Sequence, residues 1–467
     1  MKKLLIGVSA AALLAAPAIA QDNTSAVNQT GSGATATVSQ TGAENNSLVN
    51  QSAAATATVT QNGTDTDYGL APPNNDSTVN QTADGASATV DQEGQLNRSN
   101  VDQSADADAS VSQTGVYNES HVTQSANGAS ATVSQLGDPP SGGAGIGQGD
   151  NLSNVTQTGA SSANVLQTSN HTDGFASNVS NVLQNGDGSA ATVTQTGDNN
   201  ASAVTQGGSN TATVLQDGTD NSSIVNQAAS SHADVNQQGA TNTSDIEQTG
   251  DFLNASVDQT GTSNDSSILQ TRRGGNAHVD QFGDFGKSDI QQIGENNSVG
   301  SSDNAAGVQQ LSGSLRESSL IIQGGRLNSA HVTQSGTDDV SEIRQNEGYL
   351  VDHPNTNNSV TVAQSGSGNT SHVAQGSMDP LSGDFAPASD NNIASITQSG
   401  TSGLSELTQN GDGNTASVDQ SGVGDQSFIT QFGGGNGASV TQSGTGDLSN
   451  VNQNGSGNTA SVTQGGM

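Results

Sequence analysis

The chain has 467 residues, a formal net charge of −35, 59 glycines and no cysteine or tryptophan. Only 29% of its residues are hydrophobic and 2% are aromatic, which excludes the large apolar core of an ordinary globular enzyme of this length. The negative charge disfavours nucleic acid and anionic membrane surfaces as partners, and the lack of cysteine excludes a disulfide framework.

Residues 1–20 are predicted to be an export signal peptide. Two lysines precede an apolar run over residues 4–16, and small residues flank Ile19 up to a predicted cleavage after Ala20. The run is shorter than the about 20 residues of a membrane span, and no later segment approaches that length. We therefore expect an exported chain that does not insert into the membrane.

Residues 21–467 are predicted to form a single β-solenoid of repeated strands and turns. A glutamine that follows an aliphatic residue by two positions recurs in 36 arms, with a step of eleven residues from Gln398 to Gln464. The arm Asn-x-Ala-x-Val-x-Gln alternates with period two, which is typical of a strand, and a glycine-bearing link follows it. Alternate arms carry serine or alanine four residues before the glutamine, so the unit is two arms of 22 residues. An all-β solenoid of about 18 two-arm rungs follows, with parallel in-register strands in a cross-β arrangement.

The spacing breaks at five places, near residues 62–76, 137–150, 169–177, 347–358 and 377–390. All seven prolines that follow the signal lie in these breaks. Proline removes a backbone donor from a sheet, so its absence from the arms agrees with a strand ladder. We interpret the breaks as loop insertions that bulge from turns of one continuous solenoid.

Asparagine and glutamine are expected to form side-chain ladders between the two sheets, where stacked amides satisfy each other's hydrogen bonds. The serine hydroxyls are expected to be satisfied likewise. The candidate amyloid core ladder comprises Gln409, Asn414, Ala416, Val418, Gln420, Gln431, Asn436, Ala438, Val440, Gln442, Gln453, Asn458, Ala460, Val462 and Gln464.

Three C-terminal units share a pattern that first runs Gln409-x-Gly411-x-x-Asn414-x-Ala416-x-x-x-Gln420. This pattern resembles the curlin repeat, and the resemblance covers nearly the whole chain after the signal. That family has a serine six residues before the first glutamine, whereas here the serine lies two residues later, as at Ser405. The resemblance implies a secreted subunit of adhesive, biofilm-forming curli fibres, a fimbria-like functional amyloid on the surface of Gram-negative bacteria.

The same resemblance implies the partners and the location. The implied partners are further copies of the chain in a homopolymer, another curlin subunit and an outer-membrane secretion channel. The location is extracellular, in a cell-surface fibre. Both roles known in the family stay open, bulk fibre former and surface nucleator, and we favour the fibre former.

The first and last arms are expected to offer unpaired backbone groups for head-to-tail docking, since no capping element is recognisable beside them. The predicted docking rungs contain Val27, Gln29, Val38, Gln40, Val451, Gln453, Val462 and Gln464. Outward acidic side chains are expected to act as gatekeepers that repel other copies and slow premature assembly. These gatekeepers are Asp91, Asp102, Glu247, Asp258, Asp280 and Asp419.

Two other functions fit the same fold. One is a surface adhesin that does not polymerise, and the other is an ice-binding solenoid, suggested by Thr-x-Thr arms such as Thr35-Ala-Thr37. The outward face is otherwise irregular, which disfavours ice binding.

No catalytic, metal or cofactor site is predicted, so we expect a protein that is not an enzyme. A carbohydrate-active solenoid would need a carboxylate cluster and basic residues in one cleft, and the few arginines are dispersed. Four histidines sit three residues before a glutamine, on the outward face and on rungs that are not adjacent, so solvated side chains are favoured over a metal site. They are His121, His278, His331 and His372.

Overall fold

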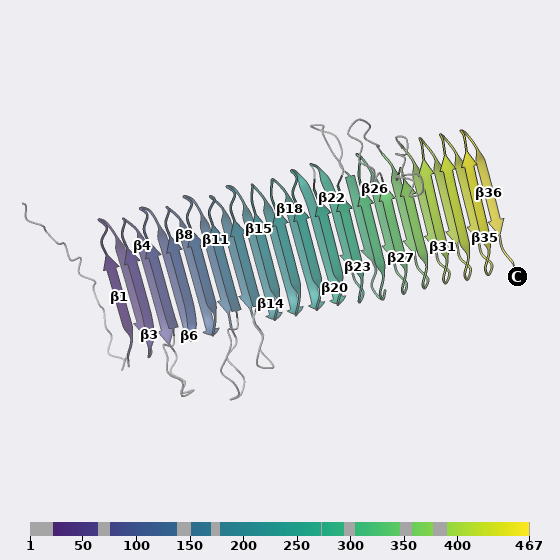
Figure 1. Cartoon of the computed structure of the whole chain (residues 1–467). Helices are drawn as coiled ribbons and strands as arrows, with labels where there is room; N and C mark the ends of the chain where they lie inside the picture. Colours follow the sequence, from purple (N-terminus) through teal and green to yellow (C-terminus); the bar gives the residue numbers. More distant parts are fainter. Residues whose placement is uncertain are drawn as a thin grey trace, which may run out of the picture. The chain divides into compact units, whose positions relative to one another are not determined.

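The computed structural model describes residues 22–63, 75–137, 151–169, 178–271, 273–293, 304–345, 357–376 and 390–466 (Figure 1). Every helix or strand within these ranges is a β-strand, and there are 36 strands. The chain divides into two compact units, Met1–Asn200 and Ala201–Met467. No helix in the described ranges is long and apolar enough to span a membrane.

The first unit contains β1 to β14. Their bounds are β1 (Thr24–Gln29), β2 (Thr35–Thr41), β3 (Asn45–Gln51), β4 (Thr56–Gly63), β5 (Asn75–Gln81), β6 (Ser87–Gln95), β7 (Asn97–Gln103), β8 (Asp108–Val116), β9 (Glu119–Gln124), β10 (Ser130–Leu136), β11 (Asn151–Gln157), β12 (Ser162–Thr168), β13 (Asn178–Gln184) and β14 (Ala190–Asp198). Odd-numbered strands pair with odd-numbered strands, from β1–β3 to β11–β13, and even-numbered strands pair with even-numbered ones, from β2–β4 to β12–β14. All these pairings are parallel, so the unit is a stack of seven rungs in two sheets.

The second unit contains β15 to β36 and repeats this arrangement. The bounds are β15 (Ala201–Gln206), β16 (Thr211–Thr219), β17 (Ser222–Gln227), β18 (His232–Ala240), β19 (Thr243–Gln248), β20 (Leu253–Thr262), β21 (Asp265–Gln270), β22 (Gly275–Gln281), β23 (Lys287–Gln292), β24 (Asn304–Gln310), β25 (Ser318–Gln323), β26 (Ser329–Gln334), β27 (Val340–Gln345), β28 (Ser359–Gln364), β29 (Thr370–Gln375), β30 (Ile393–Gln398), β31 (Leu404–Asn410), β32 (Thr415–Gln420), β33 (Gln426–Phe432), β34 (Gly437–Gln442), β35 (Leu448–Asn454) and β36 (Thr459–Gln464). Its parallel pairings run from β15–β17 to β33–β35 and from β16–β18 to β34–β36. The predicted fold class, two sheets of parallel strands with 18 strands each, is confirmed.

In the strand pairs, residues at the same position of the repeat lie opposite each other. Val27 pairs with Val49 and Gln29 with Gln51 on β1 and β3, and Gln442 pairs with Gln464 on β34 and β36. A slip by one residue would turn every inward side chain outward, so the identical pattern on each arm fixes the register.

The predicted signal peptide and most of the five predicted insertions lie outside the described residues. The strands on either side of an insertion keep the repeat register, as β3 and β5 do. The interval between β23 and β24 is also longer than the repeat, although no insertion was predicted there. Whether residues 21–467 form one continuous domain stays a prediction.

Alternate side chains of each strand lie between the sheets, as the period of two predicts. The aliphatic residue two before the glutamine is buried on every strand except β1, β2 and β36, with exposures from 0% at Val49 to 6% at Val451. The odd-numbered strands of the first unit carry valine there, and seven of the eleven in the second unit carry isoleucine or leucine. Each such side chain contributes about 1.5–3 kcal/mol on burial, and the repetition compensates for the low hydrophobic content.

The turns need glycine where successive turns stack closely. Gly433 has φ 101°, and a Cβ atom built on it would lie 2.0 Å from the carbonyl oxygen of Gly455 on the next rung. Since any side chain would collide with backbone, the predicted glycine two residues after the glutamine is required at this turn for space as well as for conformation.

The prediction that all serine hydroxyls are satisfied is wrong. Buried Oγ atoms on the inner face of the odd-numbered strands lack a hydrogen-bond partner at Ser47, Ser77, Ser99, Ser120, Ser153, Ser180, Ser202, Ser223, Ser244, Ser266, Ser288, Ser319 and Ser405. The neighbouring backbone groups are occupied by the sheet ladder, and the facing strands offer alanine methyl groups at the equivalent position. An exception is Ser371, whose hydroxyl donates to that of Ser341 at 3.2 Å.

Replacing three neighbouring unpaired serines by alanine, Ser223, Ser244 and Ser266, is therefore expected to stabilise the second unit. An unsatisfied buried polar group costs about 1–3 kcal/mol, so the midpoint of urea denaturation should rise. The matched control is the double change Ser341→Ala and Ser371→Ala, which removes a hydrogen-bonded pair and should give no gain. A lower midpoint for the triple variant would mean that these hydroxyls are satisfied in solution.

Candidate functional site

In each unit the glutamine side chains form two ladders, one in each sheet. In the second unit, Gln409 Nε2 donates to Gln431 Oε1 at 2.9 Å, and Gln431 Nε2 donates to Gln453 Oε1 at 2.8 Å. The same amide also reaches the opposite sheet, because Gln409 Nε2 donates to the carbonyl oxygen of Ile393 on β30 at 3.0 Å. Each glutamine thus links a rung to the next one and one sheet to the other.

A second ladder runs along the asparagines at the start of the strands. Asn436 accepts at Oδ1 from the backbone N–H of Asn458 at 3.0 Å, and its own backbone N–H donates to Asn414 Oδ1 at 3.0 Å. Asn436 Nδ2 donates to the carbonyl oxygen of Gly455 in the neighbouring turn at 2.9 Å. The asparagine ladder therefore secures the turns, while the glutamine ladder secures the middle of the stack.

The fifteen residues of the candidate core ladder all lie on inner positions of β31 to β36 or on the asparagine positions before them. Eleven of them are buried, and the four at the last strand are not: Asn458 just before β36 is exposed, and Ala460, Val462 and Gln464 on β36 are half-buried. Exposure rises at the end of the second unit because no further rung covers it.

The residues of the predicted docking rungs lie at the first and last strands. Val27 and Gln29 on β1 are half-buried, whereas Val49 and Gln51 at the same positions on β3 are 0% and 1% exposed. Val38 and Gln40 on β2 are half-buried as well. On the last odd-numbered strand, β35, Val451 and Gln453 remain buried at 6% and 5%. Inner-face side chains are thus partly uncovered on β1, β2 and β36.

The six gatekeeper residues all lie at outward positions. Asp91, Glu247 and Asp419 are exposed, and the other three are half-buried. Their surroundings differ, since Asp102 accepts hydrogen bonds from two asparagines while others face solvent. Burial and the neighbouring charge of Asp280 raise the pKa of Asp258, although His278 opposes the shift.

The outward histidines lie on separate strands, His121 on β9, His278 on β22, His331 on β26 and His372 on β29. His278 Nε2 lies 2.7 Å from Asp280 Oδ1, and this hydrogen bond raises the pKa of the imidazole. A carboxylate beside a histidine on the same strand is a local ion pair and needs no ligand to explain it.

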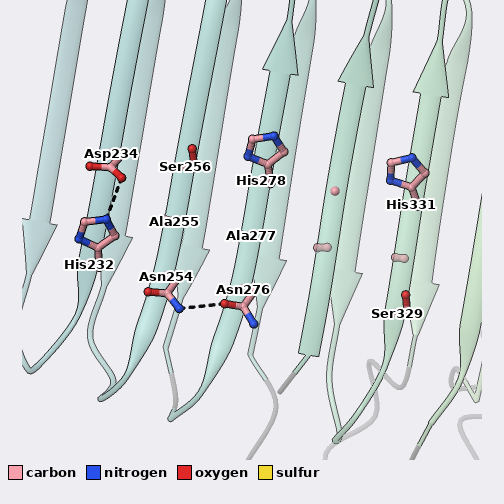
Figure 2. A pocket seen from close by; sticks show the side chains of 13 residues that line it. His232, Asp234, Asn254, Ala255, Ser256, Asn276, Ala277, His278, Ser329 and His331 are labelled. Atoms are coloured by element: carbon pink, nitrogen blue, oxygen red, sulfur yellow. Dashed lines mark hydrogen bonds and ion pairs between the residues drawn. The ribbon is translucent and has the colours of Figure 1, made fainter. Parts of the chain in front are cut away.

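A shallow hollow of about 530 Å³ lies on the outer face of the even-numbered strands of the second unit (Figure 2). His232, Asp234, His278 and His331 line it, and His232 Nε2 lies 2.7 Å from Asp234 Oδ2. Figure 2 shows the remaining labelled side chains spread along the strands. Among the described residues, no three histidine, cysteine or acidic side chains are arranged to hold a metal ion.

The sequence analysis missed acidic side chains inside the asparagine ladder of the odd-numbered strands. Glu317 and Asp339 occupy this position on successive rungs, are 1% and 0% exposed, and each keeps one carboxylate oxygen without a partner. Asp339 donates its backbone N–H to Glu317 Oε2 at 3.0 Å. Burial raises the pKa of Glu317 to about 8, and burial also raises the pKa of Asp339. The sequence does show this pair, because each acidic residue stands six residues before the glutamine, where other arms have asparagine.

Comparison with known proteins agrees with this geometry. The family model of the curlin associated repeat matches residues 105–137, 390–422 and 411–444. These segments cover β8 to β10 in the first unit and β30 to β34 in the second. No curated protein matches the chain. The chain therefore carries curlin associated repeats at these places, within a solenoid-like stack of two-arm rungs.

Proposed function

We propose that this chain is a secreted structural subunit that assembles head-to-tail into extracellular, curli-like amyloid fibres for cell adhesion and biofilm matrix. One observation carries the proposal: the same rung repeats along the chain, and the inner faces of the terminal strands are only partly covered. Val38 and Gln40 on β2 and Val462 and Gln464 on β36 are half-buried. A rung from another copy has the same pattern and would cover these side chains. The curlin repeat supports the same proposal, because its family consists of self-assembling, non-enzymatic subunits.

Assembly is tested by diluting the purified chain from denaturant and following thioflavin fluorescence with and without preformed fibres. A subunit of this kind should show a lag phase that seeds abolish. A soluble β-rich monomer that ignores seeds would overturn the proposal and favour an adhesin that does not polymerise. Thermal hysteresis of that monomer would instead favour the ice-binding solenoid.

Acidification is expected to shorten the lag phase. The outward carboxylates, with a net charge of −35 on each chain, repel incoming copies at neutral pH and lose this charge as pH falls toward 4. Asp258 should be neutralised earlier than an ordinary aspartate because its pKa is raised. We expect the lag to shorten several-fold between pH 7 and pH 4.

Salt distinguishes charge repulsion from other effects of acid. If repulsion sets the lag, sodium chloride at about 0.5 M should shorten it at pH 7, since the screening length falls to a few ångströms. A lag that responds to neither acid nor salt would remove the gatekeeper role. Another curlin subunit and an outer-membrane secretion channel are the partners that we propose from the family.

A further inference from the structure

We propose that the outer face of the even-numbered strands β2 to β14 binds the same face of a second copy, so that two stacks of rungs lie side by side. We call this surface the hydroxyl face. It comprises the outward side chains one, three and five residues before the ladder glutamine of each of these strands. The inference rests on the proposed self-assembly and adds a lateral contact to growth at the ends.

The hydroxyl face is uniform in composition. Serine or threonine occupies 16 of its 21 positions, whereas the odd-numbered strands β1 to β13 have them at four of the 21 equivalent positions. None of the 21 side chains of the hydroxyl face is buried. Its central row is continuous, because the register places each member opposite the next: Thr37, Thr58, Thr89, Ser110, Thr132, Asn164 and Thr192. The irregular outward side chains of this unit therefore belong to the odd-numbered strands.

The two outer faces also differ in hydrogen bonding. On the odd-numbered strands, Asn28 Nδ2 donates to Asn50 Oδ1 at 2.8 Å, and Asn50 Nδ2 donates to Asn80 Oδ1 at 2.8 Å. Among the described residues, the hydroxyls of the central row have no such partner, because a serine or threonine side chain is too short to reach the next rung about 4.8 Å away. The hydroxyl face therefore keeps donors and acceptors that another surface can bind.

Charge favours contact between copies through the hydroxyl face. The chain has a net charge of −35, so two copies repel each other wherever their acidic side chains meet. The hydroxyl face carries two charged side chains, Asp91 and Asp108, and the equivalent positions of the odd-numbered strands carry four. Strands β10, β12 and β14 have no charge at the three positions, and Leu166 on β12 is 41% exposed. A second copy would remove this apolar side chain from water.

A twofold axis along the stacks pairs the two faces without opposing like charges. Each strand then lies opposite the same strand of the second copy and runs in the reverse direction, so the central row faces itself and the two outer rows face each other. Asp91 faces Ser87 of the second copy, and Asp108 faces Ser112. Each carboxylate thus meets a hydroxyl donor. Identical short side chains on regular strands form interdigitated interfaces of this kind between paired sheets.

The hydroxyl face is large enough for a stable contact. Seven strands about 4.8 Å apart, with three outward positions about 6.8 Å apart, cover roughly 34 by 20 Å. Two such faces bury about 1,400 Å² in total, within the roughly 1,200–2,000 Å² of specific interfaces. Every copy along a fibre repeats the contact, so the pairing of two stacks strengthens with fibre length.

The mass per length of the fibres, measured by scanning transmission electron microscopy, tests the lateral contact. Fibres of the unchanged chain should have about twice the mass per length of a single stack of rungs about 4.8 Å apart. The triple variant Thr58→Asp, Thr132→Asp and Thr192→Asp places like charges in the central row, where each residue faces itself. It should reduce the mass per length about twofold, because like charges that meet across an interface exclude the partner.

The matched control adds the same charge to the opposite face. Thr78→Asp, Thr123→Asp and Thr156→Asp change three outward threonines of β5, β9 and β11 and should keep the mass per length of paired stacks. Equal urea midpoints of the two soluble triple variants would exclude a difference in folding.

Labelling of single cysteines gives a second readout that introduces no charge, because the chain has no cysteine of its own. Thr132 on the hydroxyl face and Thr123 on the opposite face are both exposed in the single chain. Fibres of Thr132→Cys should react with a maleimide about tenfold more slowly than fibres of Thr123→Cys, because paired sheets enclose a dry interface.

Fibres with the mass per length of one stack, or equal labelling of the two cysteine variants, would overturn the lateral contact and leave growth at the ends intact. Thermal hysteresis of such single stacks would assign the hydroxyl face to ice instead. If the chain forms no fibre, the proposed function fails, and sedimentation of the soluble chain decides the lateral contact. A dimer that the triple variant of the central row abolishes would support the contact, and a monomer would overturn it.

Discussion

Changing Gln420 to glutamate is expected to lower the free energy of unfolding of the second unit by about 4 kcal/mol at pH 8. Gln420 is 1% exposed, accepts from Gln398 at 2.8 Å, and donates to Gln442 Oε1 at 2.9 Å and to the carbonyl oxygen of Leu404 at 3.0 Å. A carboxylate of the same shape cannot donate, so both donated hydrogen bonds are lost and a charge faces two oxygen atoms. The measurement is urea denaturation of the soluble chain, followed by circular dichroism.

A matched control separates this effect from the added charge. Gln426 begins the neighbouring strand β33 with an exposed side chain, so Gln426→Glu should change the unfolding free energy by less than about 0.5 kcal/mol. The loss at Gln420→Glu should shrink as the pH falls from 8 toward 4.5, because burial favours the protonated carboxyl in the folded state and a protonated carboxyl regains one donor. Equal stability of the two variants would mean that the glutamine ladder does not hold the rungs together.

Raising the pH from 4 to 9 is expected to destabilise the second unit through Glu317. Its pKa is about 8 in the folded chain because of burial and the neighbouring Asp339, compared with an ordinary value of 4.5. Between these values the folded state holds a proton that the unfolded state releases, so this contribution is complete below pH 4.5 and is lost as the pH rises through 8. One pKa unit is worth about 1.4 kcal/mol, which sets an upper limit of roughly 5 kcal/mol for this group.

The variant Glu317→Gln should flatten this pH dependence, since glutamine is neutral throughout the range. The exposed residue Glu247 provides the matched control, and Glu247→Gln should retain the fall in stability between pH 4.5 and pH 8. Arg316 and Arg344 lower the pKa values of Asp338 and Glu342. These two carboxylates therefore affect stability only below pH 4.5, where stability falls as the pH falls. An unchanged slope in Glu317→Gln would assign the effect to other groups.

The repeat itself predicts most of the fold. The period of two within an arm predicts the strands, and the alternation of Ser405 with Ala416 distinguishes the two sheets before any coordinates are known. The register follows because each arm presents the same inner side chains, and a slip would expose all of them. The strand pairs and their burial confirm these points.

Side-chain hydrogen bonding was not predictable to the same degree. The direction of the amide ladders depends on which carbonyl oxygen of the opposite strand each glutamine reaches, as Gln464 reaches Leu448, and a sequence does not contain that offset. The expectation of satisfied serines failed because composition does not show that alanine faces them. The buried pair of Glu317 and Asp339 was missed because the pattern was read for its amides and not for acids in the same position.

X-ray diffraction from aligned fibres tests the central claim, that the chain polymerises by adding rungs to its own stack, most directly. Strands perpendicular to the fibre axis should give a sharp meridional reflection at ~4.7 Å, and facing sheets an equatorial reflection near ~10 Å. Fibres whose ~4.7 Å reflection lies on the equator would contradict the account, because their strands would run along the axis.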